Sequence, residues 1–185
     1  MANFTRKAIK ESFWKLLNER PLNQITVKDI VEECGINRNS FYYHFQDMPS
    51  LIEEIVEELI DNIIQEHPTI DSFEECLNVI LNFIISNKRA VYHIYNSVDH
   101  GILEKYLLDV CQYAVTAYIQ TVAADLPIKQ EEKELIIRYH KCECFGQIIE
   151  WLNTGMKDDI LEQVHRFCAL SKGVTNELLK NSLKS

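Results

Sequence analysis

The sequence lacks the segments that would place a protein in a membrane or outside the cell. It has no apolar run near the roughly 18 residues that a membrane-spanning helix needs. Its N-terminal stretch, MANFTRKAIK, lacks the apolar segment of a signal peptide. Six cysteines occur without any C-x-x-C pair, which indicates small core residues rather than disulfides. These absences predict a cytoplasmic protein with no membrane partner.

Residues that interrupt helices are also scarce. The 185 residues include only five glycines and four prolines, and no repeat or low-complexity stretch is present. Apolar residues recur at helical spacing nearly throughout the chain. We therefore expect an all-α fold of about nine helices, the first from about Thr5 to Glu19 and the ninth from Asp158 to about Leu179.

The common signatures of enzymes are missing. The chain has no G-x-S-x-G, no phosphate loop and no H-E-x-x-H. His140 and Cys144 lie one helical turn apart and could share a metal ion with His93 or His100, although a buried histidine beside a core thiol is the commoner arrangement. The sequence predicts no enzyme, no catalytic residue, no cofactor and no metal site.

Charge is distributed unevenly along the chain. The formal net charge is −9, with +1 over residues 1–50 and −10 over residues 51–185. Arg6, Lys7 and Lys10 open the first predicted helix, where they could meet phosphate groups or simply be solvated. The predicted helix over 47–66 carries an acidic face that we expect to point to solvent. This face comprises Glu53, Glu54, Glu57, Glu58, Asp61 and Glu66.

Residues 26–45 predict two short helices joined by a tight turn. The first has its apolar residues on one face, at the spacing i, i+3, i+4 and i+7: Val27, Ile30, Val31 and Cys34. Thr26 can cap its start, and Gly35 can adopt the left-handed conformation that ends it. Such a unit is a helix-turn-helix, whose second helix enters the DNA major groove.

The second helix has an outer surface suited to DNA. Asn37 can cap it, and Phe41 and Phe45 face inward one turn apart. Arginine and asparagine can pair with guanine and adenine edges, while Ser, Tyr and His suit phosphates or a thymine methyl. The predicted DNA contacts are Thr26, Lys28, Asn37, Arg38, Asn39, Ser40, Tyr42, Tyr43 and His44.

With the preceding isoleucine, this stretch reads I-T-V-K-D-I-V-E-E-C-G-I-N-R-N-S-F-Y-Y-H-F. It resembles the DNA-binding signature of the TetR family of bacterial transcription regulators. The resemblance implies a three-helix DNA-binding domain over residues 1–47 and a helical ligand-binding and dimerisation domain over 48–185. It also implies a phosphate-binding lysine where this chain has Met48, so one backbone contact is missing.

The last two predicted helices are more apolar than one covered face requires. The residues assigned to a dimer interface are Ile148, Ile149, Leu152, Leu161, Val164 and Phe167. They could instead form core within one chain. In the resembled family, however, the last two helices build a four-helix bundle across a two-fold axis, and a homodimer would read two half-sites.

The middle of the chain is rich in aromatic groups with polar tips. Those assigned to a ligand pocket are Tyr92, His93, Tyr95, Tyr113, Tyr118, Tyr139, His140 and Trp151. Such side chains can line a cavity for a small apolar or aromatic effector, or can be core residues whose polar tips reach the surface.

The sequence thus predicts a homodimeric, ligand-responsive repressor that binds a palindromic operator in double-stranded DNA. The alternative is a co-regulator of the same fold that acts mainly through protein contacts and binds DNA weakly. The absence of lysine at Met48 favours that alternative.

Overall fold

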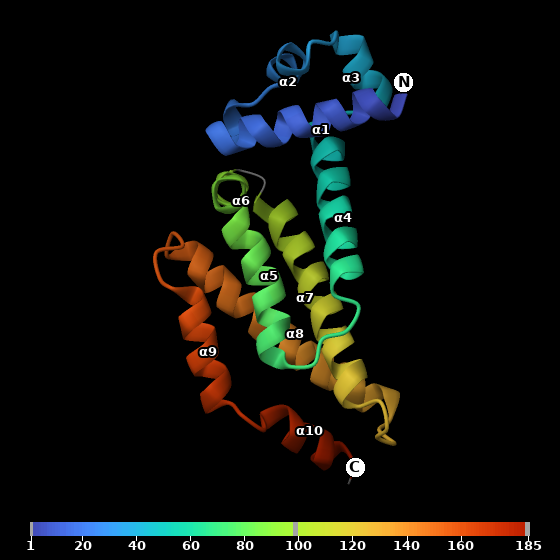
Figure 1. The fold of residues 1–185 in the computed structure, drawn as a ribbon, viewed down its shortest axis with the longest axis vertical. Helices are drawn as coiled ribbons and strands as arrows, with labels where there is room; N and C mark the ends of the chain where they lie inside the picture. The colour runs from blue at the N-terminus through green and yellow to red at the C-terminus, as the bar shows by residue number, and fades with distance from the viewer. Residues whose placement is uncertain (1, 98–99, 184–185) are drawn as a thin grey trace. The chain divides into compact units, whose positions relative to one another are not determined.

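A computed structural model describes residues 2–97 and 100–183 of the protein. Those residues contain ten α-helices and one short 3₁₀ helix, so the predicted all-α class is confirmed (Figure 1). The helices are α1 (Ala2–Glu19), η1 (Leu22–Gln24), α2 (Val27–Cys34), α3 (Arg38–His44), α4 (Met48–Glu66), α5 (Phe73–Ser86), α6 (Lys88–Tyr95), α7 (His100–Val122), α8 (Gln130–Asn153), α9 (Ile160–Leu170) and α10 (Val174–Ser182). None of the described helices is long and apolar enough to cross a membrane.

The chain divides into two compact units. The first runs to Asn62 and also takes in Asn87–Glu104, and the second comprises Ile63–Ser86 and Lys105–Ser185. Both α4 and α7 therefore begin in the first unit and end in the second. The domain boundary predicted after residue 47 concerns function and stays a prediction.

The first unit is built around α1, which packs against α2, α3 and α6. Its core combines apolar residues of all the helices in the unit. The buried members are Ile9, Phe13, Leu16, Leu17, Leu22, Ile25, Ile30, Val31, Phe41, Phe45, Leu51, Ile52, Ile55, Ala90 and Ile94. This core fixes α2 and α3 from beneath, so that the opposite face of α3 is left to solvent.

The second unit packs α5 against α9 and α8 against α10 (Figure 1). Leu77, Cys111, Cys144 and Ile148 are fully buried in it. A single helix was predicted from Asp158 to Leu179, and this prediction is wrong. The chain leaves α9 at Ser171 and begins α10 after Gly173, whose φ of 92° lies in the left-handed region that ends a right-handed helix.

Candidate nucleic-acid interface and C-terminal hollow

Two polar side chains hold the start of α2. The hydroxyl of Thr26 accepts a hydrogen bond from the Asp29 amide at 3.3 Å, and the Asp29 carboxylate accepts one from the Thr26 amide at 2.8 Å. This is a reciprocal capping box, with Arg20 paired to Asp29 at 3.0 Å. The predicted Thr26 cap is confirmed.

The turn between α2 and α3 depends on Gly35. Its φ of 68° is left-handed, and its amide donates to the Glu32 carbonyl. The next amide, of Ile36, donates to the Val31 carbonyl at 3.0 Å. The backbone therefore reverses direction within three residues, as predicted, which gives the geometry of a helix-turn-helix.

The reading helix α3 is anchored from below and capped at its start. The Asn37 side chain accepts a hydrogen bond from the Ser40 amide at 2.9 Å. Phe41 is fully buried and its ring lies 5.8 Å from that of Phe45, between centroids. The inward direction predicted for these two rings is confirmed, so the orientation of α3 is set by the core.

The predicted DNA contacts lie on the surface that this anchoring leaves open. Tyr43 is 79% exposed, whereas Ser40 and His44 are half-buried. The other exposed members of the set are Thr26, Lys28, Asn37, Arg38, Asn39 and Tyr42. Because Thr26 and Asn37 also cap helices, they position this face as well as belong to it. Their contacts with DNA stay a prediction.

The basic residues of α1 are placed differently from the expectation of free or phosphate-bound cations. Arg6 forms an ion pair with Glu54 of α4, and Lys10 pairs with both Glu54 and Glu58. Glu54 is therefore half-buried, which corrects the prediction that the whole acidic face of α4 points to solvent. Lys7 remains exposed, 3.7 Å from Glu11.

Acid should weaken the capping box of α2. Hydrogen bonds from Thr26 lower the pKa of Asp29 to about 2 from 3.8. A lowered pKa adds stability that is fully present above about pH 4 and is lost as the pH falls through about 2. The stability gap between wild type and Asp29→Ala, measured by urea denaturation at several pH values, should shrink over that range. A gap that stays constant from pH 5 to pH 2 would contradict this assignment.

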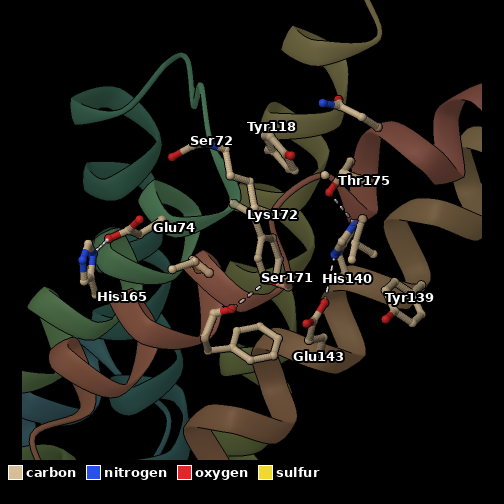
Figure 2. Close-up of a pocket in the computed structure, with 17 residues that line it drawn as sticks. Ser72, Glu74, Tyr118, Tyr139, His140, Glu143, His165, Ser171, Lys172 and Thr175 are labelled. Carbon is tan, nitrogen blue, oxygen red and sulfur yellow. Dashed lines mark hydrogen bonds and ion pairs between the residues drawn. The ribbon is translucent and has the colours of Figure 1, made fainter.

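The second unit has a hollow of about 660 Å³, here termed the C-terminal hollow (Figure 2). It lies among the start of α5, α7, α8, α9 and the α9–α10 link. The labelled residues around it are Ser72, Glu74, Tyr118, Tyr139, His140, Glu143, His165, Ser171, Lys172 and Thr175. The hollow therefore exists because the chain breaks after α9 instead of continuing as one helix.

Two histidines of the hollow are each paired with a carboxylate (Figure 2). Buried His140 lies 3.0 Å from Glu143 through Nδ1 and 3.1 Å from the Thr175 hydroxyl through Nε2. Exposed His165 lies 2.9 Å from Glu74, and this hydrogen bond raises the pKa of the imidazole. The His140 contacts tie the start of α10 to α8.

The structure brings together only part of the predicted ligand pocket. Tyr118, Tyr139 and His140 line the C-terminal hollow. Tyr113 and Trp151, although in the same unit, do not line it: the first donates to the His67 carbonyl at 3.3 Å and the second to the Asp158 carbonyl at 3.2 Å.

The other three predicted pocket residues belong to the first compact unit. They are Tyr92, His93 and Tyr95, and His93 lies 2.7 Å from the Leu17 carbonyl through Nδ1. The expectation of one eight-residue cluster is therefore corrected. Sequence reasoning missed Phe73, Glu74, Glu143 and His165, which are brought to the hollow by the packing of α5, α8 and α9. Gly173 is the one sequence signal that could have indicated the break before α10.

The six residues predicted at a dimer interface fall into two groups. Ile148, Leu152 and Val164 are buried within the chain, the intramolecular role that the sequence left open. Ile149, Leu161 and Phe167 are half-buried, and Phe167 also lines the C-terminal hollow. Only the second group retains surface for a partner.

The metal site considered for His140 and Cys144 is not assembled in the described part of the chain. Cys144 lies 3.9 Å from Cys76 between sulfur atoms, and His93 belongs to the other unit. The side chain of His100 lies outside the described residues. Across the described residues, no group of three or more His, Cys, Asp or Glu side chains is placed to hold a metal ion.

Comparison with known proteins matches both parts of the chain to one family. Residues 13–55 match the model described as bacterial regulatory proteins, tetR family, and residues 71–173 match a transcriptional regulator C-terminal region. The second match alone spans more than half of the chain.

Similar proteins include three HTH-type transcriptional regulators. The uncharacterised HTH-type regulator YxbF of Bacillus subtilis is 26% identical over 78% of this chain, which spans only 39% of the length of YxbF. The dhaKLM operon activator DhaS of Lactococcus lactis is 26% identical over 74% of this chain and 73% of its own. The icaADBC negative regulator IcaR of Staphylococcus epidermidis is 23% identical over 80% of this chain and 62% of its own.

The fold agrees with these sequence matches. A solved structure of the dihydroxyacetone kinase operon activator DhaS superimposes with a TM-score of 0.69 at 21% identity, covering 96% of each chain. At that identity the likeness concerns the fold. Together with the capped helix-turn-helix and the two family matches, it shows that the chain belongs to the TetR family of bacterial transcriptional regulators.

Proposed function

We propose that this protein binds a palindromic operator as a homodimer, through α3, and represses transcription until a small effector binds. The observation that carries the proposal is the outer face of α3. Arg38 and Asn39 are exposed on a helix that buried Phe41 fixes from beneath. Arginine can pair bidentately with guanine and asparagine with adenine in the major groove. Repression as the direction of control is supported by the likeness to IcaR, a negative regulator.

The small size of the reading helix supports a two-fold dimer. One α3 has seven residues and can reach only a few base pairs. On α8, Cys142 and Gly146 are exposed and Ile149 is half-buried, at the spacing i, i+4 and i+7 of a single helix face. Nothing lies within 4 Å of a Cβ placed on Gly146, so a second helix can approach closely there. We assign this face to the partner copy.

Ile149→Glu should convert the dimer into a folded monomer. The side chain is half-buried, so the charge should disturb the assembly more than the chain's own core. Light scattering at micromolar concentration measures the mass, and circular dichroism checks the helix content. Ile85→Glu, at an exposed position on α5, is the matched control and should remain dimeric. A monomeric wild type would remove the proposed assembly.

We assign the effector to the C-terminal hollow. Its volume of about 660 Å³ and the rings of Phe73, Tyr118 and Tyr139 suit a small, largely apolar or aromatic compound. Glu74 and Lys172 at its wall can add polar contacts. Such a compound can weaken DNA binding only if it prefers the conformation of the dimer that fits the operator poorly.

The experiment is a comparison of two duplexes. Purified protein should bind its own upstream region more tightly than a duplex of random sequence. A panel of hydrophobic compounds should contain some that lower the operator affinity, and Ala169→Trp, which places a large ring at the wall of the hollow, should reduce that response. Equal affinity for both duplexes at low salt would refute operator recognition, and operator affinity unchanged by every compound would refute the effector assignment.

A co-regulator that works mainly through protein contacts is the second candidate. Met48 opens α4 where the resembled pattern has a phosphate-binding lysine, and Arg6 and Lys10 are already paired with glutamates. Both features reduce the positive charge available to the DNA backbone. DhaS, a similar protein, is named as an activator rather than a repressor. Equal, weak affinity for both duplexes would favour this candidate.

A further inference from the structure

Four charged side chains join the first and fourth helices into one cluster, the α1–α4 charge cluster. It comprises Arg6 and Lys10 of α1 with Glu54 and Glu58 of α4. The Glu54 carboxylate contacts both Arg6 and Lys10, and the Lys10 ammonium also lies 2.5 Å from the Glu58 carboxylate. The partners are 44 or 48 residues apart in the sequence, so the cluster arises only through the packing of α4 beside α1.

The cluster lies beside the DNA-reading helix. The Arg6 guanidinium is 5.4 Å from the centroid of the Phe45 ring, and Phe45 directly follows α3. Phe45 is buried beneath α3, so Arg6 lies at the C-terminal end of that helix and not on its exposed face. Arginine and lysine side chains are long and flexible, so either one, once released at the end of a reading helix, can turn toward the phosphates that flank it.

Glu54 and Glu58 already form ion pairs with Arg6 and Lys10. The Lys10 side chain is only 13% exposed, and its ammonium group must leave Glu54 before it can meet a phosphate. Burial alone would raise the pKa of Glu54, but hydrogen bonds from Arg6 and Lys10 outweigh it and lower the pKa. Glu54 is therefore held as an anion, and neighbouring Glu58 adds a second negative charge to the same cluster.

We propose that Glu54 and Glu58 hold Arg6 and Lys10 away from DNA phosphates, and that this lowers affinity for DNA of random sequence. Phosphate contacts are independent of sequence, so withholding them weakens non-specific binding without altering the base contacts of α3. Binding to the operator weakens by a similar factor, so the base contacts of α3 supply a larger share of the affinity that remains. The two glutamates set the overall affinity for DNA, and they act through the side chains of Arg6 and Lys10. The inference rests on the proposed DNA binding.

The test measures how affinity for a fluorescent duplex of random sequence depends on salt. Each phosphate neutralised contributes about 0.9 to the slope of log affinity against log salt. Glu54→Gln should steepen the slope by about 0.9, and the double variant E54Q/E58Q by about 1.8. When the salt concentration rises from about 50 to 200 mM, each released Arg or Lys side chain should therefore increase the loss of DNA affinity by roughly a further 3.5-fold.

A matched control separates the cluster from the simple loss of negative charge. Glu57 and Asp61 are exposed on the same helix, so E57Q/D61N removes the same charge as E54Q/E58Q without touching Arg6 or Lys10. The control should tighten binding slightly and leave the slope unchanged. In the otherwise wild-type protein, Lys10→Gln should also leave the slope unchanged, because the Lys10 side chain is paired with glutamates and does not contact a phosphate. A role confined to fastening α4 to α1 would lower the melting temperature without steepening the slope.

The outcomes distinguish failure of this inference from failure of the proposed DNA binding. Equal slopes for E54Q/E58Q and E57Q/D61N, or a slope lowered by about 0.9 in Lys10→Gln, would overturn this inference while DNA binding stands. Failure of the wild type and every variant to bind any duplex at low salt would overturn the proposed function, and the inference with it.

Discussion

Phe41→Ala should cost about 3–5 kcal/mol of stability, because it removes a fully buried ring from the core beneath the reading helix. Phe41 is the inward anchor of α3 and contacts the ring of Phe45. With this cavity beneath it, α3 would no longer be held in one orientation, so operator binding should be lost. The unfolding transition of the first unit should also become less cooperative. Urea denaturation followed by circular dichroism measures the stability, and fluorescence anisotropy measures the binding.

Tyr43→Ala is the control for this effect. Tyr43 lies two residues further along α3 and is 79% exposed. Its truncation should change stability by no more than about 0.5 kcal/mol, as is usual for surface positions, while weakening binding to DNA. Unchanged stability in Phe41→Ala would mean that α3 is not held by this core contact.

Arg38→Ala should weaken operator binding by about 1–3 kcal/mol, or roughly 5- to 150-fold, and should relax the base preference at one position of each half-site. Arg38 is the first residue of α3 and is exposed, and the first residues of a recognition helix are those that meet base edges. Binding to random duplex should change much less. Anisotropy titrations with both duplexes at one fixed salt concentration give the two losses.

Arg166→Ala provides the charge-matched control for this variant. Arg166 is exposed on α9 in the second unit, so its removal changes the net charge equally but should leave both affinities near the wild-type values. Equal losses on operator and random DNA for Arg38→Ala would reassign Arg38 from base recognition to a phosphate contact.

The helix-turn-helix of residues 26–45 could be predicted closely because its determinants are local in the sequence. The Thr26 and Asn37 caps act over three residues, and the left-handed Gly35 ends α2 within one turn. The inward direction of Phe41 and Phe45 follows from their spacing of one helical turn. Short-range hydrogen bonds and helical periodicity depend on neighbouring residues. The helix-turn-helix and the all-helical class could therefore be predicted without knowledge of the packing.

Periodicity did not reveal which apolar residues would be covered by the chain itself. Ile148 and Ile149 are adjacent and chemically identical, yet the first is fully buried and the second half-buried. Their difference depends on which helices pack against each face of α8. A predicted interface containing both was therefore only partly compatible with the packed chain.

What the sequence by itself determined is the all-helical class, the helix-turn-helix and the chemistry of the α3 surface. Only the tertiary structure decided the contacts between distant residues. It placed Glu54 on Arg6 and Lys10, and it gathered Glu74 and His165 at a hollow opened by the left-handed Gly173. The physical reason is range: caps and helical faces act over a few residues, whereas ion pairs and cavities depend on how whole helices pack, which no local pattern encodes.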